Sequence, residues 1–295
     1  YVPIAPGIRL YYQLVGDGDD TVIVPHAAYL FQHFSHLAVN RKLIFIDWRN
    51  RGRSTTITDP AALALGIQHD VEDLEAVRTH FGLARISLIT HSYSAWTAAL
   101  FARRHQAHVH RIVQLGPMQP CFEKQYPAHL TCADETYHDF IERFGQLQRQ
   151  RASMDPVEFC TQCWALLRRL YVADPADAGK LDWSPCHLPD ELAFMGHWLR
   201  NLLPSIQALQ LTSAQIGEIV APVLVIHGRR DRSAPYGGGR DWAGLLPNAR
   251  LLTVDHAAHV PWIEAPDLVF GSIDTFLNGK WPDKARTVNL PDDEA

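Results

Sequence analysis

Short runs of apolar residues recur along the chain, and polar or turn-forming residues flank most of them. Continuous runs of this length are typical of strands buried on both faces of a parallel sheet, and alternation is typical of a half-buried strand. The pattern predicts strands at 8–15, 21–24, 42–46, 86–89, 109–115, 221–228 and 249–254. Helical spacing of apolar residues, or helix-favouring composition, predicts helices at 31–39, 69–81, 239–246 and 267–277, and directly after residue 92.

Strands that alternate with helices at this spacing indicate βαβ units and therefore an α/β fold, with a mostly parallel sheet wound on both faces. The alternation stops at Gly116-Pro117, and no buried-strand signature occurs between 118 and 213. That segment instead predicts helices at 135–151, 156–171 and 190–203. We therefore predict a core domain of residues 1–117 and 214–295, and a helical cap (lid) inserted at 118–213. Such an insertion would cover the carboxyl ends of the strands, where α/β proteins bind ligands.

One strand passes into a helix within about two residues, without Gly or Pro between them, and Ser92 stands at the junction. A turn this sharp forces its central residue into a strained backbone conformation and exposes its side chain at the strand's carboxyl end. We interpret the stretch as a nucleophile elbow, with Thr90 and Ser94 at the two positions where that motif usually has glycine. A serine that only caps the helix is the alternative.

Two further residues follow later strands. Asp231 comes after the strand 221–228, and His259 comes after the strand 249–254. With these residues, the chain resembles the α/β-hydrolase fold family over nearly its whole length. The resemblance rests on five motifs: His-Ala-Ala at 26–28, Asp-Trp-Arg-Asn-Arg-Gly-Arg-Ser at 47–54, the elbow, His-Gly-Arg-Arg-Asp at 227–231, and Ala-His-Val-Pro-Trp-Ile-Glu at 258–264. It implies the α/β-hydrolase fold and a catalytic triad of Ser92, Asp231 and His259.

The chemistry gives each triad member a role. A serine hydroxyl is a weak nucleophile at neutral pH and needs a base within hydrogen-bonding reach. His259 would take the serine proton and return it to the leaving group, while Asp231 would fix the imidazole tautomer and stabilise the imidazolium. The resemblance places the oxyanion hole at the backbone N–H groups of Tyr93 and Ala28, with Ala27 as the other choice for the second donor.

Other polar residues near the motifs have a structural explanation that we favour. Asp255 is close to His259 in sequence and competes with Asp231 as the acid, but it shares a strand end with the imidazole. The basic residues near the cavity mouth fit a solvated loop, the alternative being attraction of acidic substrates; they are Arg229, Arg230 and Arg232. Four residues are expected to be scaffold, with His91 pointing away from the nucleophile and the others bracing local turns or helices: His91, Asp47, Arg49 and Glu264.

Composition narrows the class of protein. A net charge of -5 over 295 residues argues against nucleic-acid binding. No apolar run approaches the ~20 residues that span a bilayer, and the first residues lack the basic and apolar regions of a signal peptide. We therefore expect a cytoplasmic protein with a small-molecule substrate and no membrane partner. The absence of an initial Met leaves a removed leader open, and the oligomeric state is also left open.

All five cysteines lie between 121 and 186, which predicts free, mostly buried thiols. Cys160 and Cys163 form a CxxC pair, but no second pair completes a zinc site, so neither a metal nor another cofactor is expected. Aromatic residues at or near the cap are candidates for substrate binding, although plain core packing is the alternative. These candidates are Trp96, Trp164, Trp183 and Trp198.

The serine nucleophile indicates a metal-independent serine hydrolase that cleaves a small or medium carboxylic ester through an acyl-enzyme. An aminopeptidase similar to proline iminopeptidases is the alternative, because the cap and the 47–54 turn fit that group. Such an enzyme needs carboxylates to hold a free α-ammonium group, and the cap offers Glu123, Asp134, Glu135, Asp139, Asp190 and Glu191. A non-catalytic ligand receptor on a hydrolase scaffold is the third possibility.

Overall fold

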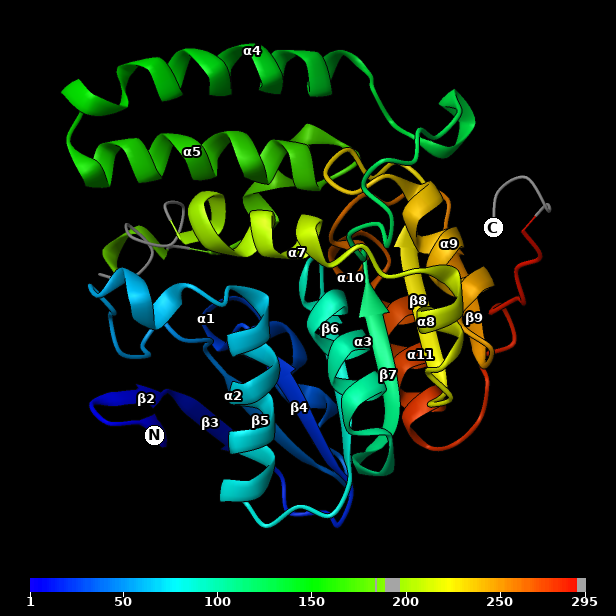
Figure 1. Cartoon of the computed structure of the whole chain (residues 1–295). Coiled ribbons are helices and arrows are strands. Elements are labelled where there is room, and N and C mark those ends of the chain that lie inside the picture. Colours follow the sequence, from blue (N-terminus) through cyan, green and yellow to red (C-terminus); the bar gives the residue numbers. More distant parts are fainter. Residues whose placement is uncertain (184, 189–196, 291–295) are drawn as a thin grey trace.

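The computed structural model describes residues 1–183, 185–188 and 197–290, and its centre within these residues is a seven-stranded sheet in the order β3-β5-β4-β6-β7-β8-β9 (Figure 1). The strands are β3 (Tyr12–Val15), β4 (Thr21–Pro25), β5 (Lys42–Ile46), β6 (Ile86–His91), β7 (Val109–Leu115), β8 (Val223–Gly228) and β9 (Ala249–Val254). Only β3 runs antiparallel to its described neighbour. The mostly parallel sheet predicted from the sequence is confirmed.

The predicted strand 8–15 is two separate strands. A small antiparallel sheet contains β1 (Val2–Ala5) and β2 (Ile8–Leu10), and β3 belongs to the main sheet. Tyr11 separates β2 from β3 and is held from both sides: its N–H donates to Ser54 Oγ at 2.9 Å, and its carbonyl accepts from the Asp47 N–H at 3.1 Å. The break therefore depends on contacts far along the chain, which the apolar alternation does not reveal.

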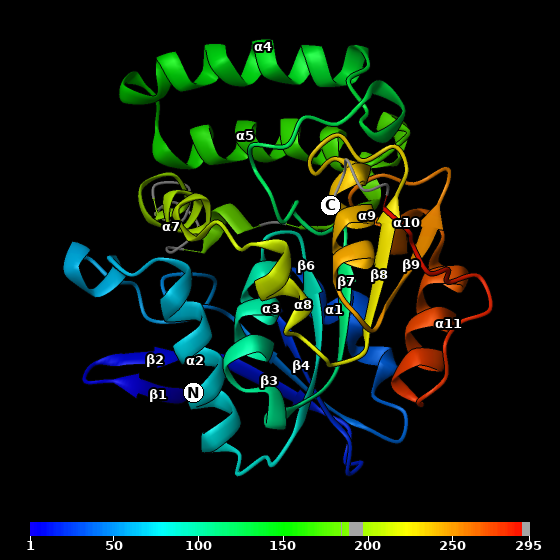
Figure 2. The same ribbon diagram turned by 45° about the vertical axis from the view of Figure 1, so that its right-hand side comes forward.

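Helices cover both faces of the main sheet (Figures 1 and 2). One face carries α2 (Ile67–His80), α3 (Ser94–Arg104), α8 (Ser213–Gly217) and α9 (Tyr236–Leu245), and the other carries α1 (Ala27–Phe34), α10 (Pro261–Glu264) and α11 (Pro266–Leu277). Successive strand residues face opposite layers: Ile23 packs in the first core and Val24 in the second. This double burial explains the continuous apolar runs.

The segment between β7 and β8 lies over the carboxyl ends of the strands (Figures 1 and 2). It contains the helical hairpin α4 (Glu135–Gln150) and α5 (Pro156–Tyr171), then α7 (Leu203–Leu209). Shorter helical turns in it are η4 (Ala128–Leu130), η5 (Arg151–Ser153), η6 (Pro175–Lys180), η7 (Pro185–His187) and the π-helix η8 (Trp198–Leu202). We call 118–213 the cap, and its standing as a separate domain stays a prediction. Residues 190–196 of the predicted helix 190–203 lie outside the described residues, and its second half is described as η8 and the start of α7.

Capping residues define where the cap helices begin. The side chain of Asp134 accepts a hydrogen bond from the Tyr137 N–H at the start of α4, and Asp155 does the same for Val157 and Glu158 at the start of α5. Short acceptors at this position satisfy backbone donors that have no partner within the helix.

Two cap cysteines form a disulfide. Cys160 on α5 is bonded to Cys186 in η7, 26 residues later, with the Cα atoms 5.8 Å apart. The prediction of free thiols is wrong for this pair, because the fold of the cap decides which cysteines meet and sequence spacing does not. Cys163, the other member of the CxxC pair, is free and buried. In the parts of the chain described, no helix is long and apolar enough to cross a membrane.

Candidate active site

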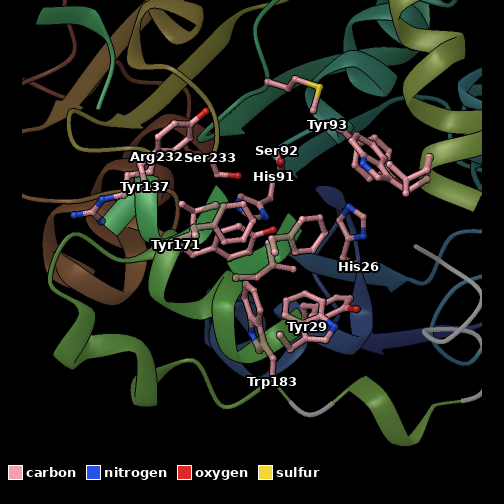
Figure 3. Close-up of a pocket in the computed structure, with 18 of the residues that line it drawn as sticks. His26, Tyr29, His91, Ser92, Tyr93, Tyr137, Tyr171, Trp183, Arg232 and Ser233 are labelled. Carbon is pink, nitrogen blue, oxygen red and sulfur yellow. The ribbon is translucent and has the colours of Figure 1, made fainter. Parts of the chain in front are cut away.

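Ser92 occupies the strained turn between β6 and α3. Its φ is 57°, in the left-handed region that non-glycine residues rarely adopt. Its N–H donates to the Leu115 carbonyl of the neighbouring strand at 3.0 Å, and its carbonyl accepts from Met118 at 3.2 Å. These bonds on both sides hold the strained residue in place, and its half-buried side chain lines a cavity beneath the cap (Figure 3). The predicted elbow geometry is therefore present.

Thr90 and Ser94, which replace the usual elbow glycines, both form hydrogen bonds through their hydroxyl groups. Thr90 Oγ1 donates to the Val113 carbonyl at 3.1 Å, within the sheet. Ser94 Oγ lies 2.6 Å from His26 Nε2, and both residues are buried. Each hydroxyl thus has a partner, so neither residue is left with an unsatisfied buried polar group.

Asp231 and His259 meet across two loops. Asp231 follows β8, His259 follows β9, and His259 Nδ1 donates to Asp231 Oδ2 at 2.8 Å. The other carboxylate oxygen accepts from the N–H groups of Ser233 and Ala234 at 2.8 Å each. Asp231 and His259 are both buried from solvent. The structure thus brings together the two residues that the sequence places after successive strands.

A second histidine shares the carboxylate. His227, at the end of β8, donates from Nε2 to Asp231 Oδ2 at 3.1 Å and lies 3.2 Å from the Ala234 carbonyl. Burial by itself would raise the pKa of Asp231, but the charge of His259 and the hydrogen bonds from both histidines hold it well below its ordinary value. The carboxylate is therefore ionised at any ordinary pH. Sequence reasoning missed His227 as a partner, although it belongs to the quoted 227–231 motif.

The remaining imidazole nitrogen, His259 Nε2, is buried and makes no hydrogen bond within the described residues, so none joins it to Ser92 Oγ. Two rings pack against the imidazole: His91 at a centroid distance of 4.5 Å and Tyr171 of the cap at 4.7 Å. With Nδ1 committed as a donor to Asp231, Nε2 is the nitrogen left to accept a proton.

His91 was expected to point away from the nucleophile, and this is wrong because its ring lines the cavity beside Ser92 (Figure 3). Its role as scaffold is nevertheless visible, since its Nε2 donates to the backbone carbonyl of His259 at 3.1 Å. Burial lowers the pKa of His91 well below its ordinary value, and the charge of His259 lowers it further. His91 is therefore neutral and anchors the loop that carries His259.

The predicted oxyanion donor Ala28 is already occupied. Its N–H donates to Asp47 Oδ1 at 2.8 Å, while Asp47 Oδ2 accepts from the Arg53 N–H at 3.1 Å. The prediction of Ala28 as a free donor is wrong, because α1 begins at Ala27 and turns the next N–H toward Asp47. Among the described residues, no hydrogen bond is found from the N–H of Ala27 or of Tyr93.

The cavity beneath the cap has a volume of about 410 Å³ and is largely apolar (Figure 3). Three of the predicted tryptophans line it, namely Trp164, Trp183 and Trp198. Trp96 does not, and that prediction is wrong: its ring is buried against Phe122 and Trp242 in the core, and its indole N–H donates to the Gln119 carbonyl at 3.0 Å.

Further aromatic and aliphatic side chains of the lining were missed. They include one face of α4, and its spacing of three and four residues was a signal available in the sequence. That face consists of Tyr137, Phe140, Ile141 and Phe144, and other missed lining residues are Tyr29, Leu167 and Tyr171.

A family model described as the alpha/beta hydrolase fold matches residues 24–266. The chain belongs to the alpha/beta hydrolase fold family. It is 24% identical over 286 residues to a proline iminopeptidase of Heyndrickxia coagulans, with 88% of this chain and 91% of that protein covered.

Two solved structures share the fold. A serine hydrolase from the polyaromatic-hydrocarbon-degrading bacterium Cycloclasticus zankles matches with a TM-score of 0.71, 17% identity, and 92% and 95% coverage of this chain and that one. An esterase from Exiguobacterium antarcticum matches with a TM-score of 0.64, 14% identity, and 92% and 96% coverage.

None of the acidic candidates in the cap of this α/β hydrolase lines the cavity, as far as the chain is described. Asp134 binds Arg232 through two short contacts of 2.7 and 2.6 Å, and Asp139 pairs with Arg143 at 2.7 Å. Glu123 accepts a weak hydrogen bond from Gln210 at 3.4 Å, and Glu135 is exposed. The other two candidates, Asp190 and Glu191, lie outside the described residues.

Asp255 and the arginines at 229, 230 and 232 lie in different surroundings. Asp255 is an exposed partner of Arg229 at 2.9 Å, and neither contacts the imidazole of His259. Arg230 is exposed, as expected of a solvated loop, but Arg232 is buried under the cap and already paired. The favoured acid is thus the one that meets the imidazole.

The turn at 47–54 is structural, as favoured from the sequence. Asp47 binds two backbone N–H groups. Arg49 does not brace that turn directly: it makes a buried bidentate ion pair with Asp73 of α2, at 2.8 and 2.5 Å, and donates to the Ala62 carbonyl at 3.2 Å. Arg51 of the same turn lines the cavity, with its guanidinium 5.1 Å from the centre of the Tyr29 ring.

Proposed function

We propose that this protein is a serine hydrolase that cleaves a carboxylic ester through an acyl-enzyme, with Ser92 as nucleophile, His259 as base and Asp231 as the orienting acid. The observation that carries the proposal is the buried 2.8 Å hydrogen bond from His259 Nδ1 to the ionised Asp231 carboxylate, beside a serine held in a strained turn. Esterase and serine-hydrolase structures with the same fold support the reaction class.

The proton path follows from this geometry. Because Asp231 holds the proton of His259 on Nδ1, Nε2 is free to take the proton of Ser92 Oγ as that oxygen attacks the ester carbonyl carbon. The imidazolium then protonates the departing alcohol, which leaves the acyl group on Ser92. A water molecule, deprotonated by the same nitrogen, releases the acid and regenerates the serine. The structure does not contain a hydrogen bond from Oγ to Nε2 in the part of the chain that it describes, and catalytic hydrogen bonds of this kind are often well formed only when substrate is bound.

The tetrahedral intermediate carries a negative oxygen that needs two donors. We assign these to the N–H of Tyr93, which follows the nucleophile, and the N–H of Ala27. Both amides lack a partner within the described residues, whereas the Ala28 N–H is bound to Asp47. Ala27 is the alternative left open by the sequence, and the occupied Ala28 favours it.

The cavity favours a neutral ester with an apolar acyl or alcohol group. Its described lining is dominated by aromatic and aliphatic side chains. Its charged members are Arg51 and Arg232, both cationic. A free α-ammonium group would be costly to bury there, because the described lining offers it no carboxylate. The acidic substrate attraction considered for Arg232 is not supported, because its guanidinium is bound to Asp134.

An aminopeptidase is the second candidate, favoured by the relative named proline iminopeptidase. The test compares p-nitrophenyl butyrate with prolyl-p-nitroanilide and its N-acetylated form. We expect rapid turnover of the ester and slow turnover of both anilides. Faster turnover of the free-amine anilide, lost on acetylation, would reverse this ranking. No turnover of any substrate would instead favour a ligand receptor.

The nucleophile is tested by fluorophosphonate labelling followed by peptide mapping. We expect the label on Ser92, and we expect Ser92→Ala to lower kcat by several orders of magnitude while the protein stays folded. A serine that only caps a helix would cost about 1 kcal/mol of stability and no activity. A folded Ser92→Ala protein with undiminished turnover contradicts the proposal.

A further inference from the structure

Three consecutive cap residues, Tyr171 to Ala173, are hydrogen-bonded to both loops that carry the proposed acid and base. The first contact involves the base itself: the backbone N–H of His259 donates to the Tyr171 carbonyl at 2.9 Å. The Tyr171 ring packs on the imidazole at 4.7 Å and also lines the cavity (Figure 3). One cap residue therefore touches both the space for substrate and the residue that would activate the nucleophile.

The second contact comes from the residue next to the proposed acid. Arg232 donates to the carbonyl of Val172 at 2.5 Å and to that of Ala173 at 3.0 Å. It also pairs with Asp134 at the start of α4, and this hydrogen-bonded pair lowers the pKa of Asp134 to about 2. The Arg232 side chain is only 1% exposed, so its charge is committed to the cap.

The third contact is a single carboxylate that spans the boundary between cap and core. Glu264 Oε1 accepts from the Ala173 N–H of the cap at 2.6 Å, and Oε2 accepts from the Ala258 N–H, one residue before His259, at 2.7 Å. Burial raises the pKa of Glu264, while the two N–H groups act in the opposite direction. The expectation that Glu264 braces its own short helix is therefore too local, because both carboxylate oxygens bind outside that helix.

We propose that Glu264 is a positioning residue for the base: it joins the cap segment 171–173 to the loop of His259, so that the imidazole is in place only when the cap is seated. This inference rests on the proposed function. A base must reach the serine oxygen at hydrogen-bonding distance, and a misplacement of about 1 Å can cost roughly 100-fold in rate. His259 is held through its own backbone by the cap, and Glu264 fixes the neighbouring residue of the same loop.

The test is Glu264→Gln, which keeps the size of the side chain but leaves one acceptor oxygen in place of two. Its amide NH₂ would face one of the two backbone N–H donors. We expect kcat for p-nitrophenyl butyrate to fall at least about 10-fold, while KM stays within about twofold, because the cavity lining is unchanged. Fluorophosphonate labelling of Ser92 should slow by a similar factor. Glu142→Gln, an exposed change on α4, is the matched control and should leave both rates unchanged.

A folded Glu264→Gln protein with wild-type kcat, or with a raised KM alone, overturns the inference. If this variant does not fold, Glu264→Asp keeps both acceptor oxygens on a side chain too short to bind both N–H groups, and wild-type kcat there overturns the inference too. These results are distinct from failure of the proposed function, in which the wild-type protein neither hydrolyses esters nor labels at Ser92. That outcome removes the base that Glu264 would position and overturns both.

Discussion

Gly239 on α9 allows a direct test of the buried contact between His227 and Asp231. A Cβ at this position would stand against His227 Nδ1 and would lie 2.9 Å from Cγ of the same ring. The ring has no room to give, because it is buried and its other nitrogen is bound to Asp231 at 3.1 Å. Gly239→Ala should therefore push His227 off the carboxylate without touching the cavity or Ser92.

The expected cost combines three effects. A hydrogen bond to a charged group contributes about 1.5–3 kcal/mol, and overpacking of a tight site costs about 1–3 kcal/mol. The better helix propensity of Ala offsets roughly 1 kcal/mol of this. We expect the free energy of unfolding to fall by about 1.5–5 kcal/mol on these grounds, and kcat to fall because the carboxylate that orients His259 is disturbed.

The pH dependence of this variant has a definite sign. Asp231 has a pKa lowered in the folded state, so its contribution to stability is present above its unfolded pKa of about 3.9 and is lost as pH falls through the folded value. Without His227, one cause of the lowering is removed while burial still raises the pKa. Gly239→Ala should therefore lose stability at a higher pH than the wild-type protein during acid titration.

Urea denaturation and ester kinetics measure both effects, and Gly271→Ala is the matched control. A Cβ at Gly271, in the middle of α11, meets nothing within 4 Å. The same substitution there should stabilise the protein by about 0.5–1 kcal/mol and leave kcat unchanged. If Gly239→Ala behaved like Gly271→Ala, the argument that His227 is packed as one unit with Asp231 would be refuted.

Three further predictions follow from other contacts. Asp231→Asn should lower kcat by about 10⁴ with the fold retained, while Asp255→Asn should stay near wild type; the reverse order in steady-state kinetics would identify the wrong acid. Asp70 is 2% exposed, and burial followed by a neighbouring carboxylate raises its pKa well above the ordinary value. Its contribution to stability is therefore full below about pH 4 and is lost as pH rises through the folded pKa. As pH rises above about 4, the free energy of unfolding of Asp70→Asn should increase relative to that of the wild-type protein by up to about 1.4 kcal/mol per pH unit. Denaturation curves that give a constant difference between the two proteins from about pH 5 to 7 would contradict this. Replacing Cys160 by Ser, which opens the link to Cys186, should lower the free energy of unfolding by about 3 kcal/mol, and a thiol reductant should then have no further effect on the denaturation curve.

Strand positions were predictable because burial on both faces leaves a strong local signal. The five residues of β4 and the six of β8 are all buried, and the sequence shows unbroken apolar runs at 22–24 and 223–226 within them. The same argument placed Asp231 and His259, since residues just past parallel strands gather at one edge of the sheet. The break at Tyr11 carried no such signal, because Ser54 and Asp47 hold it from far along the chain.

Side-chain direction within helices was harder to predict than helix position. Trp96 and Trp164 both lie on helices, yet one packs in the core and the other lines the cavity. Periodicity identifies a face but does not say which layer that face meets. The apolar face of α4 was equally visible, and only the placement of the cap over the sheet shows that it meets the cavity. The disulfide between Cys160 and Cys186 has the same origin, because a cap fold decides which thiols meet.

Ser94, which stands where the elbow motif usually has glycine, is bonded to His26 and so to the segment that precedes Ala27. His26 has a left-handed φ of 70°, is buried, and has a pKa that burial lowers well below the ordinary value, so it is neutral. Its Nδ1 has no partner among the described residues, and its Nε2 depends on Ser94 Oγ at 2.6 Å. A glycine at 94 would match the family motif better but would leave both nitrogens of a buried ring unsatisfied, which costs about 1–3 kcal/mol for each lost partner. The serine that weakens the motif thus ties α3 to the residue preceding Ala27, and so links the elbow to the amide that we assign to the oxyanion hole.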